Sequence, residues 1–259
     1  MISLAMIVKN EETGIKRALE SARGSVGEIV VVDTGSMDRT KEIAGKFGAT
    51  LVDRPFDGDF SAARNVAISA CRGEWILFLD GDEFFPLSPK IMLEAAVDPV
   101  IAGEPNSYKG YYLLRHNYEE SAMEVTYSDY VLRLFRNGPG VRYRHRVHET
   151  VEDSLDSIDG KYGKLTAMPL SHHLFERDET YAGAKRALYL EGLLKDIAEN
   201  PADAGRYDFL GCEYVRLGRL KKAEEAFQKF LRLMPGDPGG LESLEMVRRL
   251  IREEGIKLT

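Results

Sequence analysis

Short apolar runs alternate with amphipathic stretches over the first 85 residues of the chain. The runs typical of strands buried on both faces of a parallel sheet are residues 2–8, 29–32 and 75–79. Helical spacing, with apolar side chains three and four positions apart, occurs at residues 12–21, 38–47 and 62–70. This order predicts an open α/β sheet with right-handed crossovers, in which ligands bind outside the carboxyl ends of the strands.

The pattern changes beyond residue 108. Four further runs predict strands, at residues 111–116, 130–135, 141–147 and 164–170. The Asn-Gly-Pro-Gly sequence at residues 137–140 predicts a turn between two of them. We expect these strands to complete the sheet and to form one wall of a cleft, so that residues 1–176 make one α/β domain.

After Glu176 the strand patterns stop and helical patterns begin. Residues at the spacing of a tetratricopeptide repeat, a pair of interlocking antiparallel helices, are Tyr207, Leu210, Gly211, Tyr214, Ala223, Phe227 and Pro235. Because one repeat cannot bury its own apolar face, we expect the preceding helix and the helix at 241–251 to cover it. That last helix also has arginines beside its apolar face, a pattern compatible with peripheral binding to an anionic membrane. The sequence predicts a small all-α domain at 177–259, with one repeat at about 204–235.

Composition narrows the classes of function. The chain has 259 residues and a net charge of −7, which argues against general binding of nucleic acid. Cys71 and Cys212 lie far apart without metal-site spacing, as in proteins of a reducing compartment. The first apolar run is too short and too weakly charged for a secretory signal, and no run approaches the roughly 18 apolar residues that span a bilayer. We expect a cytoplasmic protein without a transmembrane segment.

The strand predicted at 75–79 runs directly into Asp80, Gly81, Asp82 and Glu83. On an extended backbone, Asp80 and Asp82 point to the same face, and Gly81 has no Cβ to block the approach of a ligand. Two carboxylates suit Mg²⁺ or Mn²⁺, which prefer oxygen ligands and fill their remaining positions with phosphates and water. The motif predicts a divalent metal that bridges a diphosphate, and the alternative is an exposed acidic turn.

Polar residues also follow the other two predicted strands, at residues 9–11 and 33–38. Asp33 can accept a hydrogen bond from the imide N–H of uracil or from the amino edge of guanine, and Gly35 lets the turn run close to the base. The alternative is a plain strand-to-helix turn. Arg64, early in the third predicted helix, either lies against the base or a phosphate or is a solvated surface residue.

Several common sites are absent from the sequence. A calcium loop that began at Asp80 would place Phe84 and Phe85 at ligand positions. The glycine patterns of a dinucleotide fold and of a P-loop are both incomplete. His145 and His148 do not form the helical motif of a zinc hydrolase.

Four segments, taken in order, resemble the successive motifs of family 2 glycosyltransferases: residues 3–12, 33–40, 60–65 and 79–83. The resemblance implies the GT-A fold and an inverting transfer from a nucleotide-diphospho sugar, with a UDP-sugar favoured. It implies that the nucleotide is bound by Val8, Asn10, Glu11, Asp33, Gly35, Arg64, Asp80 and Gly81. Asp80 and Asp82 are the implied ligands of Mn²⁺ or Mg²⁺. A single tetratricopeptide unit behind the domain is similar to a bacterial subgroup, some of whose members glycosylate proteins or peptides.

A second Asp-Gly-Asp sequence occurs at residues 57–59. It follows Pro55 and precedes the predicted helix at 62–70, which Ser61 or Asp59 can cap. Capping and loop roles therefore explain this copy better than metal binding does.

Two further roles fall to the later half of the first domain. We expect a third metal ligand at His172, which follows the last predicted strand and matches the position where similar enzymes place a histidine. His173 is the rival, and a packed histidine between domains is the alternative. An inverting displacement needs a base, and Glu149 is expected to serve because related sequences often carry His-Glu here. Asp129 and Asp153 are alternatives for the base, as is an ordinary surface role for Glu149.

The charges at the predicted site call for a cation. A sugar nucleotide brings about two negative charges to a rim that already holds Asp80, Asp82 and Glu83. Like charges 4 Å apart repel by about 4 kcal/mol at an effective dielectric near 20. A divalent ion between the carboxylates and the diphosphate would remove this repulsion and would stabilise the departing nucleoside diphosphate.

The sequence does not name the acceptor, which can be a saccharide, a lipid carrier or a polypeptide. Arg142, Arg144 and Arg146 would project from one face of the strand predicted at 141–147, either to bind phosphates or an acidic acceptor or to form a solvated edge. Two other functions compete. A sugar-phosphate nucleotidyltransferase would carry a glycine-rich basic loop that this chain lacks, and a degenerate α/β domain in an interaction protein would not need the intact motifs.

Overall fold

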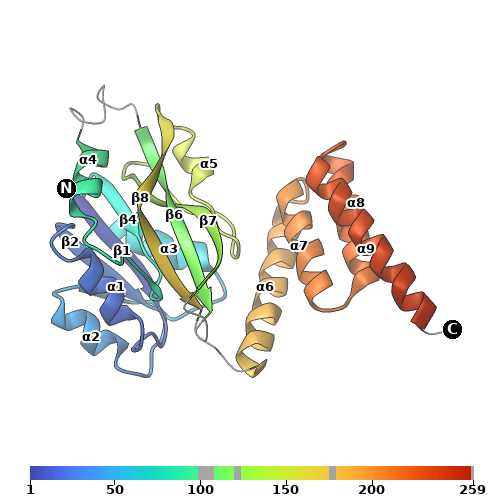
Figure 1. Cartoon of the computed structure of the whole chain (residues 1–259), viewed down its shortest axis with the longest axis horizontal. Coiled ribbons are helices and arrows are strands. Elements are labelled where there is room, and N and C mark those ends of the chain that lie inside the picture. The colour runs from blue at the N-terminus through green and yellow to red at the C-terminus, as the bar shows by residue number, and fades with distance from the viewer. Residues whose placement is uncertain (99–107, 120–123, 175–178, 258–259) are drawn as a thin grey trace. The chain divides into compact units, whose positions relative to one another are not determined.

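A computed structural model describes residues 1–98, 108–119, 124–174 and 179–257 of the chain (Figure 1). The contacts divide the chain into two compact units. The first unit comprises residues 1–144 and 149–176, and the second comprises residues 145–148 and 177–259. The domains predicted from the sequence, at residues 1–176 and 177–259, remain a prediction.

The first unit is built on a sheet of eight strands in the order β3-β2-β1-β4-β7-β6-β8-β5 among the described residues. The strands are β1 (Ile2–Val8), β2 (Glu28–Asp33), β3 (Thr50–Asp53), β4 (Trp75–Phe78), β5 (Glu83–Phe84), β6 (Tyr108–Glu119), β7 (Val125–Arg136) and β8 (Lys161–Leu174). Strands β1 to β4 are parallel, and β7 joins them antiparallel to β4. The mixed sheet with the parallel half first confirms the predicted α/β class.

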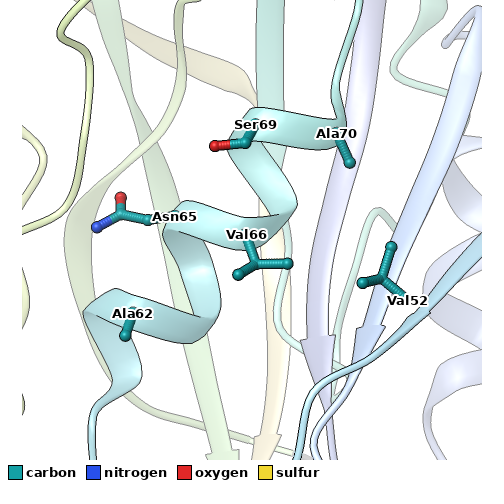
Figure 2. A pocket seen from close by; sticks show the side chains of 6 residues that line it. All are labelled: Val52, Ala62, Asn65, Val66, Ser69 and Ala70. Carbon is teal, nitrogen blue, oxygen red and sulfur yellow. The ribbon is translucent and has the colours of Figure 1, made fainter.

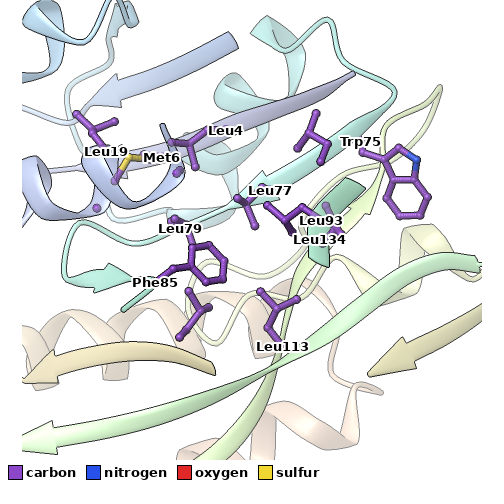
Figure 3. Packing of buried hydrophobic residues seen from close by; sticks show 14 of the residues in the cluster. Leu4, Met6, Leu19, Trp75, Leu77, Leu79, Phe85, Leu93, Leu113 and Leu134 are labelled. Atoms are coloured by element: carbon purple, nitrogen blue, oxygen red, sulfur yellow. The ribbon is translucent and has the colours of Figure 1, made fainter. Parts of the chain in front are cut away.

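Helices cover both faces of the sheet. They are α1 (Ile15–Ala22), α2 (Thr40–Lys46), α3 (Phe60–Ala70), α4 (Lys90–Val97) and the short α5 (Glu152–Leu155). Helices α1, α2 and α4 contribute buried residues to the core on one face, and α3 and α5 contribute to the core on the other. Figure 3 shows the first core, where side chains of β1 and β4 such as Leu4 and Leu77 face Leu113 and Leu134 from the later strands. Apolar burial on both faces fixes the positions where the central strands end.

One predicted strand is wrong. Residues 141–147 form no strand, and the only pairing there is an isolated antiparallel bridge between Arg144 and Thr150. The backbone takes positive φ angles at His145 (72°) and His148 (49°), which an extended strand does not allow. The arginines of this segment therefore do not share one strand face.

The second unit is helical, with α6 (Glu179–Glu199), α7 (Ala204–Arg216), α8 (Leu220–Leu233) and α9 (Pro238–Lys257). Helices α7 and α8 are the predicted repeat, and their close approach depends on Gly211, where a Cβ would lie 2.6 Å from the ring of Phe227. Leu244 and Val247 of α9 are buried in the same cluster as Phe227, so the apolar face of α9 packs on the repeat. None of the described helices combines the length and apolarity needed to cross a membrane.

Residues 145–148 pack within the second unit. The Arg146 guanidinium contacts the Asp196 carboxylate of α6 at 2.8 Å. The buried Arg206 of α7 donates a hydrogen bond to the carbonyl of Val147 at 2.9 Å. These contacts give Arg146 a structural partner in place of the phosphate or acidic acceptor considered from the sequence.

Candidate functional site

The carboxyl ends of β1, β2 and β4 meet at one edge of the sheet, because these neighbouring strands are parallel. The loops after β1 and β2 are joined by hydrogen bonds. Asn10, at a φ of 55°, donates from its backbone N–H to Ser36 Oγ at 2.9 Å and accepts from the backbone N–H of Met37 at 2.8 Å. Glu11 donates from its backbone N–H to Thr40 Oγ1 at 2.8 Å. The structure thus brings the predicted nucleotide-binding segments onto one rim.

Asp33 closes β2 and is only 1% exposed. Its Oδ1 accepts hydrogen bonds from the backbone N–H groups of Gly35 at 3.0 Å and Ser36 at 2.8 Å. Its Oδ2 is buried and has no hydrogen-bond partner among the described residues. Gly35 has a φ of 111°, which a residue with a Cβ rarely adopts. A buried carboxylate oxygen without a partner is unfavourable, so this geometry has a place for a donor from a ligand.

Asp80 follows β4 and has an arginine on each oxygen. Arg64 Nη2 donates to Oδ1 at 3.0 Å, and Arg133 Nη2 donates to Oδ2 at 2.5 Å. Burial by itself would raise the pKa of Asp80, but the charges of Arg133 and Arg64 hold that pKa well below its usual value. The expected rim of three uncompensated carboxylates is therefore not what the structure shows, and both oxygens of Asp80 are already engaged by the protein.

Arg64 is a buried residue of α3, 7% exposed, and is not a solvated surface arginine. Its guanidinium lies 4.6 Å from the ring centroid of Phe78 and is flanked by Tyr143. Its Nε donates to Glu149 Oε1 at 2.7 Å. Arg64 thus connects Asp80 to Glu149, the residue expected to act as base, although the two carboxylates are far apart in the sequence.

Arg133 was not foreseen from the sequence, and a β-bulge places it. The pairing of β6 with β7 passes from Tyr111–Leu134 to Tyr112–Leu132, which leaves Arg133 without an opposite residue. A bulge of this kind redirects a side chain, and Arg133 also donates to the fully buried Glu83 at 2.7 Å. A charged residue in the middle of an apolar run was the signal that could have identified it.

Glu83 and Arg115 continue this buried network. Arg115 of β6 donates from Nη1 to Glu83 Oε1 at 2.9 Å and pairs through Nη2 with Asp129 Oδ2 at 2.5 Å. Arg115 therefore contacts both carboxylate oxygens of Asp129, which leaves neither of them free to take a proton and does not favour Asp129 as the alternative base. Asp153, the other alternative, lies in the first turn of α5.

Asp82 differs from Asp80, because its carboxylate faces a histidine. Strand β5 pairs with β8 so that Glu83 lies opposite His172, and this register brings Asp82 Oδ2 to 3.4 Å from His172 Nε2. The neighbouring His173 has its ring 5.2 Å from that of Phe84 and 5.1 Å from that of Tyr118, centroid to centroid. His173 donates from its backbone N–H to the carbonyl of Asp82 at 3.3 Å, whereas His172 is the histidine whose ring faces the Asp82 carboxylate.

Asp82 and His172 fit a divalent cation that takes part of its ligands from a substrate. Within the described ranges, no group of three or more His, Cys, Asp or Glu side chains could hold a metal ion. Mg²⁺ commonly binds one or two protein carboxylates and completes its shell with phosphates and water. Neighbouring ligands of an octahedral ion lie about 3 Å apart when its bonds are about 2.1 Å long. The separation of 3.4 Å between the two atoms is close to that value.

Gly81 has a packing role that the sequence did not predict. A Cβ at Gly81 would lie 2.7 Å from Cγ of Glu11, so the absent side chain makes room for Glu11. Gly14, just before α1, lies under the same turn, where a Cβ would be 2.5 Å from the carbonyl oxygen of Gly81. These two glycines let the loop after β1 and the turn after β4 pack backbone to backbone.

Two other features are not part of the site. Asp59 caps α3 by accepting from the backbone N–H of Ala62 at 2.8 Å, and Asp57 pairs with Arg54 at 2.9 Å, as expected for a structural copy of the motif. A hollow beside α3, shown in Figure 2, is lined by Val52, Ala62, Asn65, Val66, Ser69 and Ala70. It contains no ionisable side chain, so the chemistry lies elsewhere.

Comparison with known proteins adds an independent line of observation. Residues 3–110 match the model of glycosyl transferase family 2. A TPR repeat-containing protein of Synechococcus elongatus is 36% identical over 236 residues, which cover 89% of this chain and 56% of that protein. The SPbeta prophage-derived glycosyltransferase SunS of Bacillus subtilis is 30% identical over 250 residues, covering 88% of this chain and 54% of SunS. The chain thus spans about half the length of these curated relatives.

Solved structures with a similar fold include S. aureus TarS. The whole protein aligns with a TM-score of 0.56 at 15% identity, covering 91% of this chain and 49% of TarS. Residues 1–349 of TarS, in complex with UDP-GlcNAc, align with a TM-score of 0.54 at 14% identity, covering 90% of this chain and 81% of that one. At this identity the likeness concerns the fold, which is that of GT-A proteins.

Proposed function

We propose that the first unit, which has the GT-A fold and whose residues 3–110 match the model of glycosyl transferase family 2, transfers a sugar from a nucleotide-diphospho sugar, preferably a UDP-sugar, to an acceptor. The observation that carries the proposal is the pairing of two features on one rim. Asp33 has a buried oxygen that lacks a donor, and Asp82 with His172 offers two ligands that face each other. A nucleoside diphosphate presents an N–H edge and a metal-binding diphosphate at its two ends.

The nucleobase of the donor lies, in this proposal, at the end of β2. The imide N–H of uracil donates to Asp33 Oδ2, while Oδ1 stays on the backbone of the turn. Gly35 gives the base access, and Val8, Asn10 and Glu11 form the adjoining wall at the end of β1. A uracil fits a lone acceptor at this point because its imide carries one N–H between two carbonyl groups.

The diphosphate lies at the end of β4. Asp82 and His172 would hold Mn²⁺ or Mg²⁺, which when bound neutralises the charge that develops on the departing nucleoside diphosphate. Asp80 was also expected to bind the metal, but its oxygens are engaged by Arg64 and Arg133. We assign to Asp80 the role of fixing these two guanidinium groups beside the diphosphate, where Arg64 has one buried nitrogen, Nη1, without a partner among the described residues.

Glu149 is our choice for the general base, which takes the proton of the acceptor in an inverting displacement. Arg64 Nε holds its Oε1 at 2.7 Å, and the side chain is 14% exposed, so the carboxylate is oriented and remains accessible. The same guanidinium orients Asp80. Arg64 therefore fixes Glu149 relative to the turn that binds the diphosphate. This is the geometric requirement for attack from the face opposite the leaving group.

The proposal is tested by calorimetric titration of UDP, GDP and dTDP with and without Mn²⁺. We expect UDP to bind best, to require Mn²⁺, and to lose at least about tenfold in affinity in Asp82→Asn. Asp57→Asn is the matched control, because Asp57 occupies an Asp-Gly-Asp sequence without a metal role, and it should bind as the wild type does. Absence of binding with every nucleotide, or tight binding that is independent of metal, would reject the proposal.

The identity of the sugar donor and the role of Glu149 as general base are tested next. Screening sugar nucleotides for slow hydrolysis without an acceptor would name the sugar. With that donor, saccharides, lipid carriers and polypeptides can be compared as acceptors. Glu149→Gln should lower transfer by about 100-fold or more while leaving UDP binding within about twofold of the wild type. Unchanged transfer by this variant would remove Glu149 from the mechanism.

A further inference from the structure

Asn117 is a fully buried polar residue in β6 that contacts His172. The sheet register places Asn117 opposite His172 of β8 on one side and opposite Tyr127 of β7 on the other. The Asn117 Oδ1 atom lies 2.7 Å from His172 Nδ1. The Asn117 Nδ2 atom lies 3.2 Å from Asp129 Oδ1 and 3.4 Å from the carbonyl oxygen of Tyr127.

The neighbours of Asn117 fix which way its amide points. A carboxylate and a backbone carbonyl only accept hydrogen bonds, so the NH₂ group must face Asp129 and Tyr127. Asp129 is ionised, because hydrogen bonds and charge from Arg115 outweigh its burial and lower its pKa. The Asn117 Oδ1 atom is therefore left to face His172, and it accepts the hydrogen bond from Nδ1.

This assignment places a proton on Nδ1 of His172. A neutral imidazole that donates from Nδ1 has its lone pair on Nε2. That nitrogen faces Asp82 Oδ2 at 3.4 Å, so in this neutral form two acceptors face one another. Such a pair is repulsive by itself and is stabilised when a proton or a metal ion lies between the two atoms.

We propose that Asn117 is a positioning residue, fixed by the Arg115–Asp129 pair, that holds His172 in the Nδ1–H form and aims Nε2 at a divalent cation shared with Asp82. This inference rests on the proposed function, since the cation is the one that would bind the diphosphate of the donor. Partners of this kind behind a metal-binding histidine fix its tautomer and ring orientation. His173 has Phe84 and Tyr118 against its ring instead, which supports His172 as the ligand.

The first test measures Mn²⁺ affinity in the presence of a fixed concentration of UDP. Asn117→Ala removes the acceptor for Nδ1–H and should weaken Mn²⁺ binding by about 10- to 100-fold. Asn117→Gln keeps an amide oxygen for Nδ1–H and an NH₂ group for Asp129 and Tyr127, and should bind Mn²⁺ at least about threefold more tightly than Asn117→Ala does. Asn137→Ala is the matched control, because Asn137 donates to the backbone carbonyls of Cys71 and Gly73, which are not part of the site. Wild-type affinity in Asn117→Ala, or equal losses in the Ala and Gln variants, would overturn the proposal.

The second test reads the tautomer without metal or nucleotide. The chain has five histidines, so ¹⁵N-histidine labelling gives few signals, and His172→Gln identifies the one of interest. In the wild type at pH 8, the ring of His172 should show the Nδ1–H pattern, and Asn117→Ala should shift it toward Nε2–H. An Nε2–H ring in the wild type would overturn the proposal.

The two tests separate this inference from the function itself. A wild-type protein that binds neither Mn²⁺ nor UDP would reject the transferase assignment. A wild-type protein that binds both, with Asn117→Ala binding equally well, would reject only the role of Asn117. If Asn117→Ala does not fold, Asn117→Gln and the wild-type tautomer still decide the question.

Discussion

The carboxyl ends of β2 and β4 are each followed or closed by an aspartate, Asp80 after β4 and the buried Asp33 in β2, and the surroundings of the two carboxylates differ. Asp33 has backbone N–H groups on one oxygen and nothing on the other. Asp80 has a guanidinium on each oxygen. The contacts that an aspartate already makes decide whether it can serve a ligand. Asp33 is open to a donor, Asp80 is committed to the protein, and Asp82, two residues beyond, faces His172 instead of an arginine.

The largest expected difference between the two ends is in stability. Asp80→Asn leaves the charges of Arg64 and Arg133 partly uncompensated, and should lower the free energy of unfolding by about 3 kcal/mol. Asp33→Asn has no cationic partner to strand and should lower it by about 1 kcal/mol or less. Urea denaturation of both variants measures the difference. Equal losses would show that the two carboxylates are stabilised in the same way.

The second prediction concerns binding, where the order of the two aspartates reverses. Asp33→Asn would turn an amide N–H or a neutral oxygen toward the base and should weaken uridine binding by about 10- to 100-fold. Asp80→Asn, where it folds, should leave uridine binding within about threefold of the wild type, because its contacts lie at the diphosphate end. Calorimetry with uridine tests both. An unchanged affinity of Asp33→Asn for uridine would place the nucleobase elsewhere.

The pH dependence of stability should differ between two carboxylates of the first unit, Asp80 and Asp129, and His148 of the second unit. The pKa values of Asp80 and Asp129 are lowered, so their contribution to stability is lost only as the pH falls below 3.8. Burial lowers the pKa of His148 to about 4 from 6.5, and its ring stacks on Phe209. The unfolded chain then binds more protons than the folded chain between pH 6.5 and 4, so stability falls as the pH drops through this window.

The size of this effect is measurable. The free energy of unfolding should drop by about 2 kcal/mol between pH 7 and pH 5 because of His148. His148→Phe keeps a ring against Phe209 and should remove most of that drop. Urea denaturation at the two pH values tests it. The same slope in the variant and in the wild type would assign the pH dependence to other groups.

The smallest expected effect concerns the contact between the two loops. Gly14→Ala places a Cβ 2.5 Å from the carbonyl oxygen of Gly81, which only a backbone shift can relieve, and should cost about 1–2 kcal/mol. Gly45→Ala in α2 is the matched control, since its Cβ meets nothing within 4 Å, and it should be neutral or stabilising by about 0.5 kcal/mol. Thermal denaturation compares the two. Similar midpoints would show that the loops are not in tight contact.

The strand ends were predictable because their signals are local. Apolar runs stop where polar residues begin, and in a parallel sheet the carboxyl ends share an edge, so Asp33, Asp80 and Asp82 were found from the sequence. Asp59 as a helix cap followed from its position before an amphipathic stretch, and the structure confirms it. The spacing at 204–235 likewise predicted the helix pair that the structure contains.

The arginines were not predictable in the same way. Arg133 reaches Asp80 only because β7 lies beside β4 and because a bulge turns its side chain, and neither fact can be read from a local pattern. The strand expected at 141–147 failed for a related reason. Its alternation is compatible with a strand, but the positive φ angles at His145 and His148 depend on packing of residues 145–148 within the second unit.

The central claim is that the nucleobase and the metal-bound diphosphate occupy opposite ends of one rim. The nucleobase lies at Asp33, and the diphosphate lies at Asp82 with His172. Its most direct test compares uridine with UDP, each titrated by calorimetry with and without Mn²⁺. Mn²⁺ should strengthen UDP binding by at least about tenfold and leave uridine binding unchanged, because uridine has no phosphate to share the ion. The account would be contradicted if Mn²⁺ strengthened both ligands equally or neither of them.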